Sequence, residues 1–164
     1  MVITLALATA VAGVSLAVFQ HPPVQDALLD KLVGKWEITR VHKNETEINV
    51  ATCEWVLDHH FMRISMRDPK DKNGYQANVY ITLNSVIKKY EIYWLDTFAG
   101  TWPGSVGYGH KKDDSIVFEW KDSDGTLRNT FEWKEDAKTW TSTIDQTDEN
   151  GKWTNFAIDT YRKK

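Results

Sequence analysis

The sequence predicts an all-β fold, an up-and-down antiparallel β-barrel with a short N-terminal helix capping one end. Apolar and polar residues alternate with a period of two in successive short runs between residues 36 and 162, as in strands with one buried face. Asn-Gly or Asp-Gly pairs at 73–74, 124–125 and 150–151 are typical hairpin turns. No interval after residue 33 is long enough for a crossover helix, which excludes a parallel βαβ topology.

The first twenty residues have the pattern of a targeting segment. Val2 to Phe19 is apolar apart from two Thr and one Ser, and no Lys or Arg precedes Lys31. A Ser-x-Ala pattern ending at Ala17 predicts a secretory signal peptide at 1–20, cleaved near Ala17. The alternative is an uncleaved N-terminal membrane anchor, because the run is just long enough to span a bilayer. The expected location is therefore secreted or periplasmic, with no stable membrane insertion once the signal is cleaved.

Residues 21–27 are a Pro-containing linker, and residues 28–164 are the predicted barrel domain. Across the boundary between the two, Gln25 to Val33 has the pattern of a helix of about two turns, with Leu28, Leu29 and Leu32 on one face. A helix this short is marginal alone, so we expect it to lie across one end of the barrel.

The predicted strands follow at the spacing of an up-and-down barrel, about ten in all. Their alternating residues are Trp36/Ile38/Arg40, Met62/Ile64/Met66, Tyr75/Ala77/Val79/Ile81/Leu83, Tyr90/Ile92/Trp94, Ile116/Phe118/Trp120, Leu127/Phe131/Trp133, Trp140/Ile144 and Phe156/Ile158/Arg162. Between Asp96 and Lys112 five Gly and Pro residues interrupt the alternation around Trp102 and Tyr108. This interval is expected to be a bent strand pair or a loop beside the barrel mouth.

The composition excludes several classes of function. Charged residues make up 26% of the chain and the formal net charge is -3, without the basic stripe of a nucleic-acid-binding protein. Cys53 is the single cysteine, so no internal disulfide forms, and its strand context predicts a buried thiol rather than a nucleophile. The chain contains no nucleophile elbow, P-loop or dinucleotide fingerprint.

Three short blocks resemble a known family. Leu32-Val33-Gly34-Lys35-Trp36-Glu37, Glu54-Trp55-Val56-Leu57-Asp58-His59-His60-Phe61 and Tyr93-Trp94-Leu95-Asp96 resemble successive blocks of domain-of-unknown-function family 1579, which is regarded as lipocalin-like. The resemblance covers nearly all of residues 28–162. It implies a calycin-type barrel and the binding of a small hydrophobic ligand. It also implies structural roles for Gly34, Trp36 and Arg162, with Arg162 stacked on Trp36 at the closed end.

No metal or cofactor is predicted. A related branch of ten-stranded barrels binds haem through a late His, whereas the last His here is His110. His59 and His60 are adjacent, and neighbouring strand residues point to opposite faces, so a hairpin turn is preferred to a metal site.

The predicted function is reversible binding or transport of a small apolar or amphipathic molecule inside the barrel. The alternatives are a barrel enzyme, such as an isomerase or lyase, and a structural domain whose core is filled. An eight-stranded barrel is just fillable by its own side chains, whereas about ten strands leave room for a ligand. Asp96, Tyr108 and His110 are candidates for orienting the ligand's polar end. The full predicted site is Met62, Ile64, Val79, Ile81, Trp94, Asp96, Trp102, Tyr108, His110, Phe118, Trp120 and Trp133.

Overall fold

The computed structural model describes residues 22–97, 106–122 and 125–164. The predicted signal segment and Trp102 therefore lie outside the described residues.

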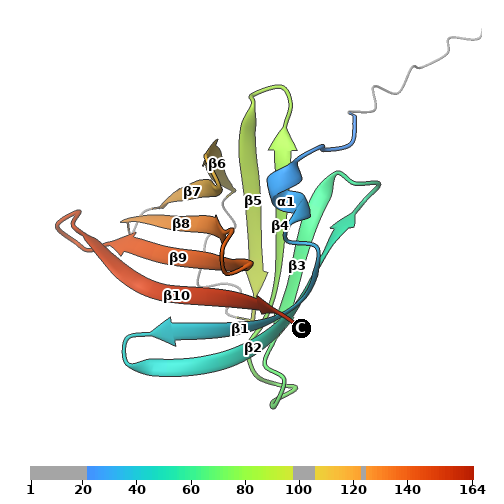
Figure 1. Cartoon of the computed structure of the whole chain (residues 1–164). Helices are drawn as coiled ribbons and strands as arrows, with labels where there is room; N and C mark the ends of the chain where they lie inside the picture. The colour runs from blue at the N-terminus through green and yellow to red at the C-terminus, as the bar shows by residue number, and fades with distance from the viewer. Residues whose placement is uncertain (1–21, 98–105, 123–124) are drawn as a thin grey trace, which may run out of the picture.

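Ten strands close into one barrel, in which each strand pairs antiparallel with the next in sequence and β1 pairs with β10 (Figure 1). This confirms the predicted up-and-down antiparallel barrel. The strands are β1 (Gly34–His42), β2 (Glu45–Val56), β3 (Phe61–Arg67), β4 (Gln76–Asn84), β5 (Lys89–Asp96), β6 (Gly107–Lys112), β7 (Ser115–Asp122), β8 (Gly125–Lys134), β9 (Thr139–Thr147) and β10 (Trp153–Lys163).

The alternation of side chains decides which face of each strand is buried. In β3, Met62, Ile64 and Met66 are buried, whereas Arg63 and Ser65 between them are only partly buried. Their neighbours across the ladder continue the same inner face, since Ile64 pairs with Cys53 of β2 and with Val79 of β4. The core is therefore the interior of the barrel, built from every second residue of each strand.

One short helix, α1 (Ala27–Asp30), precedes β1 and lies against one end of the barrel (Figure 1). It is a single turn, shorter than the Gln25–Val33 helix that the sequence indicated. The chain leaves the helix through i to i+3 hydrogen bonds from Lys31 N to Leu28 O and from Leu32 N to Leu29 O, which tighten its last turn. Leu28, Leu29 and Leu32 are buried in the core, so the predicted cap is confirmed.

The last strand, β10, contains a register shift in its pairing with β9. A β-bulge between Asn155 and Ala157 precedes the regular pairing with β9. Beyond it Ala157, Asp159 and Tyr161 are buried, whereas Ile158 and Arg162 are exposed. The apolar residues that marked this strand in the sequence therefore lie on its outer face, and its inner face carries a buried carboxylate.

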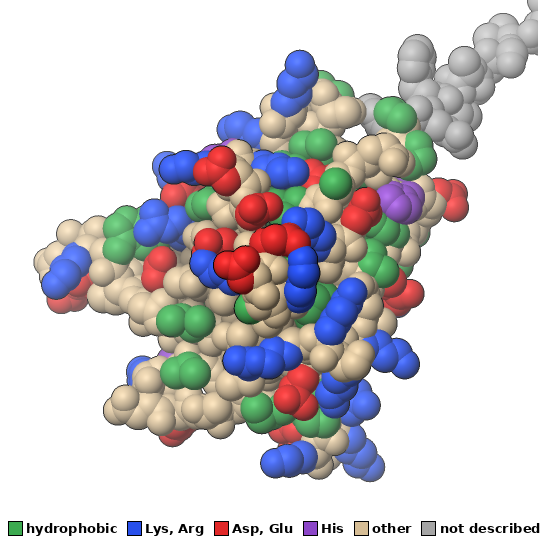
Figure 2. Space-filling view, in the orientation of Figure 1, with side chains coloured by type: hydrophobic (Ala, Val, Ile, Leu, Met, Phe, Trp, Pro, Cys, Tyr) green, Lys and Arg blue, Asp and Glu red, His purple; other side chains and the backbone are tan. Residues whose placement is uncertain are grey.

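The outer surface mixes charges of both signs. On the face shown in Figure 2, Lys and Arg side chains are interspersed with Asp and Glu and with isolated hydrophobic side chains.

Candidate functional site: the barrel interior

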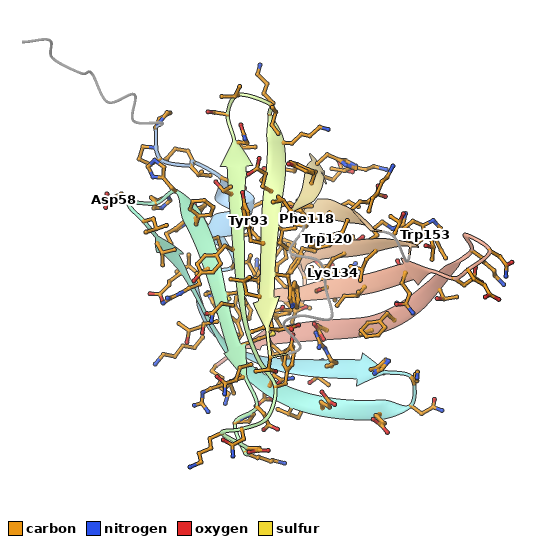
Figure 3. All side chains as sticks on the ribbon, turned by 180° about the vertical axis from the view of Figure 1, so that it is seen from behind. Asp58, Tyr93, Phe118, Trp120, Lys134 and Trp153 are labelled. Atoms are coloured by element: carbon orange, nitrogen blue, oxygen red, sulfur yellow. The ribbon has the colours of Figure 1, made fainter. Side chains whose placement is uncertain are left out.

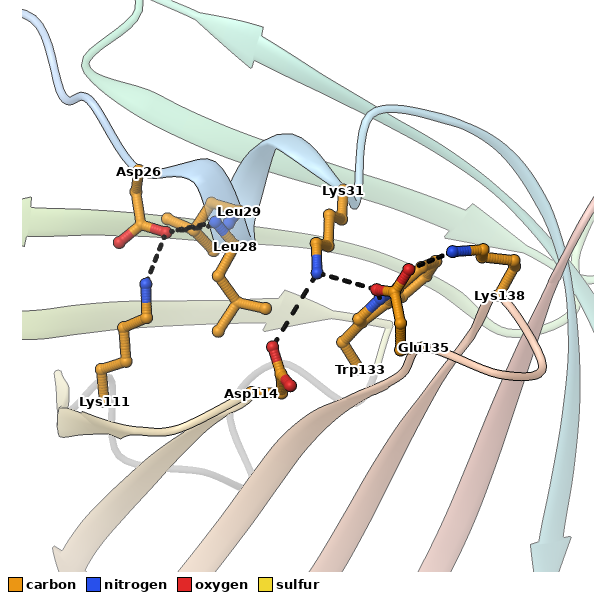
Figure 4. A network of polar contacts seen from close by, with 9 residues as sticks. All are labelled: Asp26, Leu28, Leu29, Lys31, Lys111, Asp114, Trp133, Glu135 and Lys138. Carbon is orange, nitrogen blue, oxygen red and sulfur yellow. Dashed lines mark hydrogen bonds and ion pairs between the residues drawn. The ribbon is translucent and has the colours of Figure 1, made fainter.

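Polar contacts fasten α1 across its end of the barrel (Figure 4). Asp26 is the N-cap, and its Oδ1 accepts hydrogen bonds from Leu28 N at 2.8 Å and Leu29 N at 3.0 Å. The Tyr90 hydroxyl donates to the other oxygen, and Lys111 Nζ lies 3.5 Å from Oδ1. Burial acts to raise the pKa of Asp26, but the hydrogen bonds and the Lys111 charge outweigh it and hold the pKa below its ordinary value.

A second group of contacts joins α1 to the turns of the opposite strands (Figure 4). Lys31 Nζ lies 3.1 Å from Glu135 Oε2 and 3.8 Å from Asp114 Oδ1. The same ammonium lies 5.3 Å from the centre of the Trp133 ring, whose Nε1 donates to Glu135 at 2.5 Å. This end of the barrel is thus closed by one turn of helix fixed to β5, β6 and the β8–β9 turn.

The two adjacent histidines lie in the β2–β3 turn, as the sequence predicted. The His59 ring stacks on Trp55 at 4.1 Å, and its Nδ1 lies 2.8 Å from Val24 O. His59 O in turn accepts a hydrogen bond from Val24 N at 3.0 Å. Its role in the structure is to fix the segment before α1. Within residues 22–97, 106–122 and 125–164, no group of three or more His, Cys, Asp or Glu could hold a metal ion.

Most of the predicted ligand-binding residues share the inner face of the barrel. Trp133 is buried, whereas Trp94 and Trp120 are partly buried against the core; Phe118 and Trp120 can be followed in Figure 3. Five aliphatic, Met or Phe members of the predicted set are fully buried: Met62, Ile64, Val79, Ile81 and Phe118.

Tyr108 and His110 lie on the outer face, and the polar cluster expected from Asp96, Tyr108 and His110 is not assembled. In β6 the inward positions belong to Gly107 and Gly109, so Tyr108, 48% exposed, and His110 point outward. A Cβ at Gly107 would lie 2.4 Å from Trp120 of the neighbouring strand β7, which shows how closely the core packs against this strand. Asp96 is half-buried at the end of β5, where its Oδ2 accepts from Trp94 Nε1 at 3.2 Å.

A buried polar layer, absent from the predicted set, lies on the inner face farther from α1. Arg40 Nε and Nη2 donate to Asp159 Oδ1 and Oδ2 at 2.7 and 2.8 Å, and Asp159 is fully buried. The Arg40 guanidinium lies 5.4 Å from the centre of the Tyr75 ring. Burial acts to lower the pKa of Arg40, but the bonds to Asp159 outweigh it and raise that pKa, so Arg40 stays protonated.

Amide and hydroxyl groups complete this layer. On β8 and β9 the Ser142 hydroxyl donates to Asn129 Oδ1 at 2.8 Å, and both residues are buried. Asn49 of β2 is buried as well. The interior therefore has an apolar, aromatic layer beneath α1 and a polar layer beyond it.

Two further residues concern the chemistry of the interior. Cys53 is buried, and burial raises the pKa of its thiol to about 12, so it is a thiol at neutral pH and not a nucleophile. The Trp36 ring is buried and its Nε1 donates to Leu32 O at 2.6 Å. The cation near this ring is Lys163, with Nζ at 5.4 Å.

The expected stacking of Arg162 on Trp36 is therefore corrected. Trp36 pairs with Lys163 across β1 and β10, whereas Arg162 pairs with Glu37 and is exposed. Because side chains alternate along a strand, the residue on the Trp36 face is Lys163 and not its neighbour.

No model of a protein family matches the chain, and no curated protein matches it. The described residues contain no helix that is long and apolar enough to span a membrane. The class that the structure itself establishes is a closed ten-stranded antiparallel β-barrel.

Proposed function

We propose that this protein binds a small apolar or amphipathic molecule reversibly in the barrel interior. The observation that carries the proposal is the division of the inner face into an aromatic layer beneath α1 and a polar layer around Arg40 and Asp159. An apolar surface with a few placed polar groups is the usual lining of a small-molecule site. We also propose that the barrel is lipocalin-like, that the chain is related to family 1579, and that its N-terminal segment directs export.

The buried ion pair favours ligand binding over a core with a purely structural role. Desolvating two charges costs several kcal/mol, and apolar residues of similar volume at such positions are often neutral or stabilising. A barrel selected only for stability gains little from Arg40 and Asp159 in its centre.

The enzyme alternative loses its main candidates in this arrangement. Tyr108 and His110 point away from the interior, and Asp96 lies on the inner face, so the three groups do not act on one molecule. The polar groups brought together instead, Arg40 with Asp159 and Asn129 with Ser142, bond to one another. The guanidinium of Arg40 and the amide of Asn129 are not general bases, and they suit the orientation of a polar end.

Fluorescence titration with N-phenyl-1-naphthylamine, a neutral apolar probe, tests the proposal. Trp94→Ala removes a half-buried ring from the inner face of β5. The lost contact, about 1.5–3 kcal/mol, should weaken probe binding roughly tenfold or more. Its neighbour Tyr93 lies on the outer face against Phe61, so Tyr93→Ala is the matched control and should leave probe binding unchanged (Figure 3).

Denaturant unfolding of the same two variants separates a binding site from a filled core. With a binding site, Trp94→Ala lowers probe affinity much more than it lowers the free energy of unfolding. Failure of the wild-type protein to bind the probe, or equal losses of probe affinity and stability in Trp94→Ala, would refute the proposal.

A further inference from the structure

Two buried hydrogen-bond donors on the inner face have no partner within the described residues. They are Trp140 Nε1 and the Tyr161 hydroxyl, and both side chains are fully buried. Trp140 of β9 and Tyr161 of β10 are direct partners in the β-ladder, so the two side chains project from neighbouring positions on one wall of the barrel. Buried polar groups almost always have a partner, so each exception requires an explanation.

Four other buried or half-buried tryptophans provide a contrast with Trp140. Trp36, Trp55, Trp94 and Trp133 each donate their indole N–H to an acceptor in the protein, namely Leu32 O, Asp30, Asp96 and Glu135. Trp140 is as deeply buried as Trp36 but has no such acceptor among the described residues. The part of the chain that the structure describes therefore supplies acceptors to these four indoles and none to Trp140.

The chemistry of the two groups defines what would bind them. An indole N–H is only a donor, and a phenol donates while it is protonated. Burial raises the pKa of Tyr161 well above its ordinary value, with the Asp159 charge acting in the same direction, so the phenol remains a donor at neutral pH. Both groups therefore require an acceptor atom.

The charges of the interior select an uncharged acceptor. Along the inner face of the described strands, the cations are Arg40, which Asp159 neutralises, and Lys111 and Lys163 at the α1 end. Asp159 lies on β10, two residues before Tyr161, and is fully buried. An anion placed against Tyr161 would be desolvated close to Asp159, while Arg40 is already paired and Lys163 is exposed at the end of the strand, so its burial there is unfavourable.

The surroundings of the two donors are aromatic. The Tyr161 ring centre lies 6.4 Å from those of Trp36 and Phe131, and the Trp140 ring centre lies 5.6 Å from that of Trp133. A flat, apolar ligand body is complementary to such walls.

We propose that Trp140 and Tyr161 form a donor subsite for the acceptor oxygen of an uncharged ligand, a ketone, ester or amide with an apolar body. This inference rests on the proposed function and names the ligand class of the same interior.

Three naphthalene probes with one ring skeleton test it in the full chain. The first is 6-propionyl-2-dimethylaminonaphthalene, a neutral ketone. The second, 2-dimethylaminonaphthalene, lacks the ketone, and the third, 6-dimethylamino-2-naphthoate, replaces it with a carboxylate. Fluorescence titration should rank the ketone as the tightest ligand. Tighter binding of the carboxylate than of the ketone would overturn the selection of an uncharged group.

Tyr161→Phe removes the hydroxyl and keeps the ring. It should weaken binding of the ketone about 3- to 10-fold and leave binding of the ketone-free probe unchanged. Tyr108→Phe, a tyrosine on the outer face, is the matched control and should change neither. Thermal unfolding should show that Tyr161→Phe folds normally, since the lost hydroxyl has no partner in residues 22–97, 106–122 and 125–164.

The outcomes separate this inference from the proposed function. If the ketone-free probe binds but Tyr161→Phe does not alter ketone affinity, internal water serves the two donors and the subsite is refuted while ligand binding stands. Equal losses for both probes in Tyr161→Phe would assign the effect to packing and also refute the subsite. If none of the three probes binds the wild-type protein, the proposed function itself fails.

Discussion

Replacing Arg40 with Met should destabilise the barrel by about 3–5 kcal/mol, because it leaves the Asp159 carboxylate buried without its partner. Asp159 has no exposed surface, and both of its oxygens accept from Arg40, at 2.7 and 2.8 Å. A domain is typically stable by about 5–15 kcal/mol, so this variant should still fold but with a large fraction of its stability lost.

The matched variants separate the lost partner from lost packing. Arg40→Met combined with Asp159→Leu replaces both charges by apolar groups and should recover most of the loss, giving a coupling energy of about 3 kcal/mol. Arg63 and Glu54 form an ion pair on the outer face, with side chains 36% and 46% exposed. Arg63→Met should therefore cost about 1 kcal/mol or less.

Urea unfolding followed by far-ultraviolet circular dichroism measures these free energies, with an unchanged m-value as the check that each variant unfolds as the wild type does. A loss below about 1 kcal/mol for Arg40→Met, or a double variant no more stable than the single one, would refute the account of a desolvated pair.

Three further predictions concern stability and reactivity. Asp26→Ala should cost about 2–4 kcal/mol in urea unfolding, because it removes an N-cap and the partner of the Tyr90 hydroxyl. Since the folded pKa of Asp26 lies below the ordinary 3.8, its stabilisation is present above that pH and is lost as pH falls through the folded pKa. Asp26→Asn should accordingly flatten the loss of stability below about pH 4, and a curve parallel to the wild type would contradict this. Cys53, with a thiol pKa raised to about 12, should react with iodoacetamide at pH 8 far more slowly in the native protein than in urea; equal rates would be inconsistent with burial. Gly109→Ala places a methyl group 2.6 Å from Phe118 and should cost about 1–3 kcal/mol, whereas an unchanged midpoint would mean that β6 adapts freely.

The fold was predictable because the local signals agree with one another. Met62, Ile64 and Met66 alternate with Arg63 and Ser65, and the structure buries the first set while leaving the second only partly buried. The Asn150-Gly151 pair marks a turn in which Gly151 has φ 76°, a conformation that glycine adopts without strain. The apolar part of the candidate site follows from the same alternation.

The orientation of Tyr108 and His110 was not predictable, because their neighbours in β6 carry no side chain that reports burial. Glycine at 107 and 109 looks like loop sequence, yet these two positions face the core. With glycine at both inward positions, the sequence of β6 shows neither the alternation of a strand nor which residues face the core.

The buried polar layer depends on closure of the barrel. Arg40 and Asp159 are 119 residues apart and become neighbours only because β1 pairs with β10. Each occupies an inward position next to buried inward neighbours, Ile38 in β1 and Ala157 and Tyr161 in β10. A charged residue at such a position was the available signal in the sequence. Which strands meet at the closure is a property of the whole barrel and not of either segment.

Methyl NMR of isoleucine-labelled protein titrated with N-phenyl-1-naphthylamine shows whether a ligand enters the barrel. Ring currents from a bound probe should shift the methyl signals of Ile64 and Ile81, which are fully buried inside the barrel. The signals of Ile48 and Ile158, about two-fifths exposed on the outer face, should stay in place. Shifts confined to the outer isoleucines, or no shift of any isoleucine at saturating probe, would contradict ligand binding in the barrel interior.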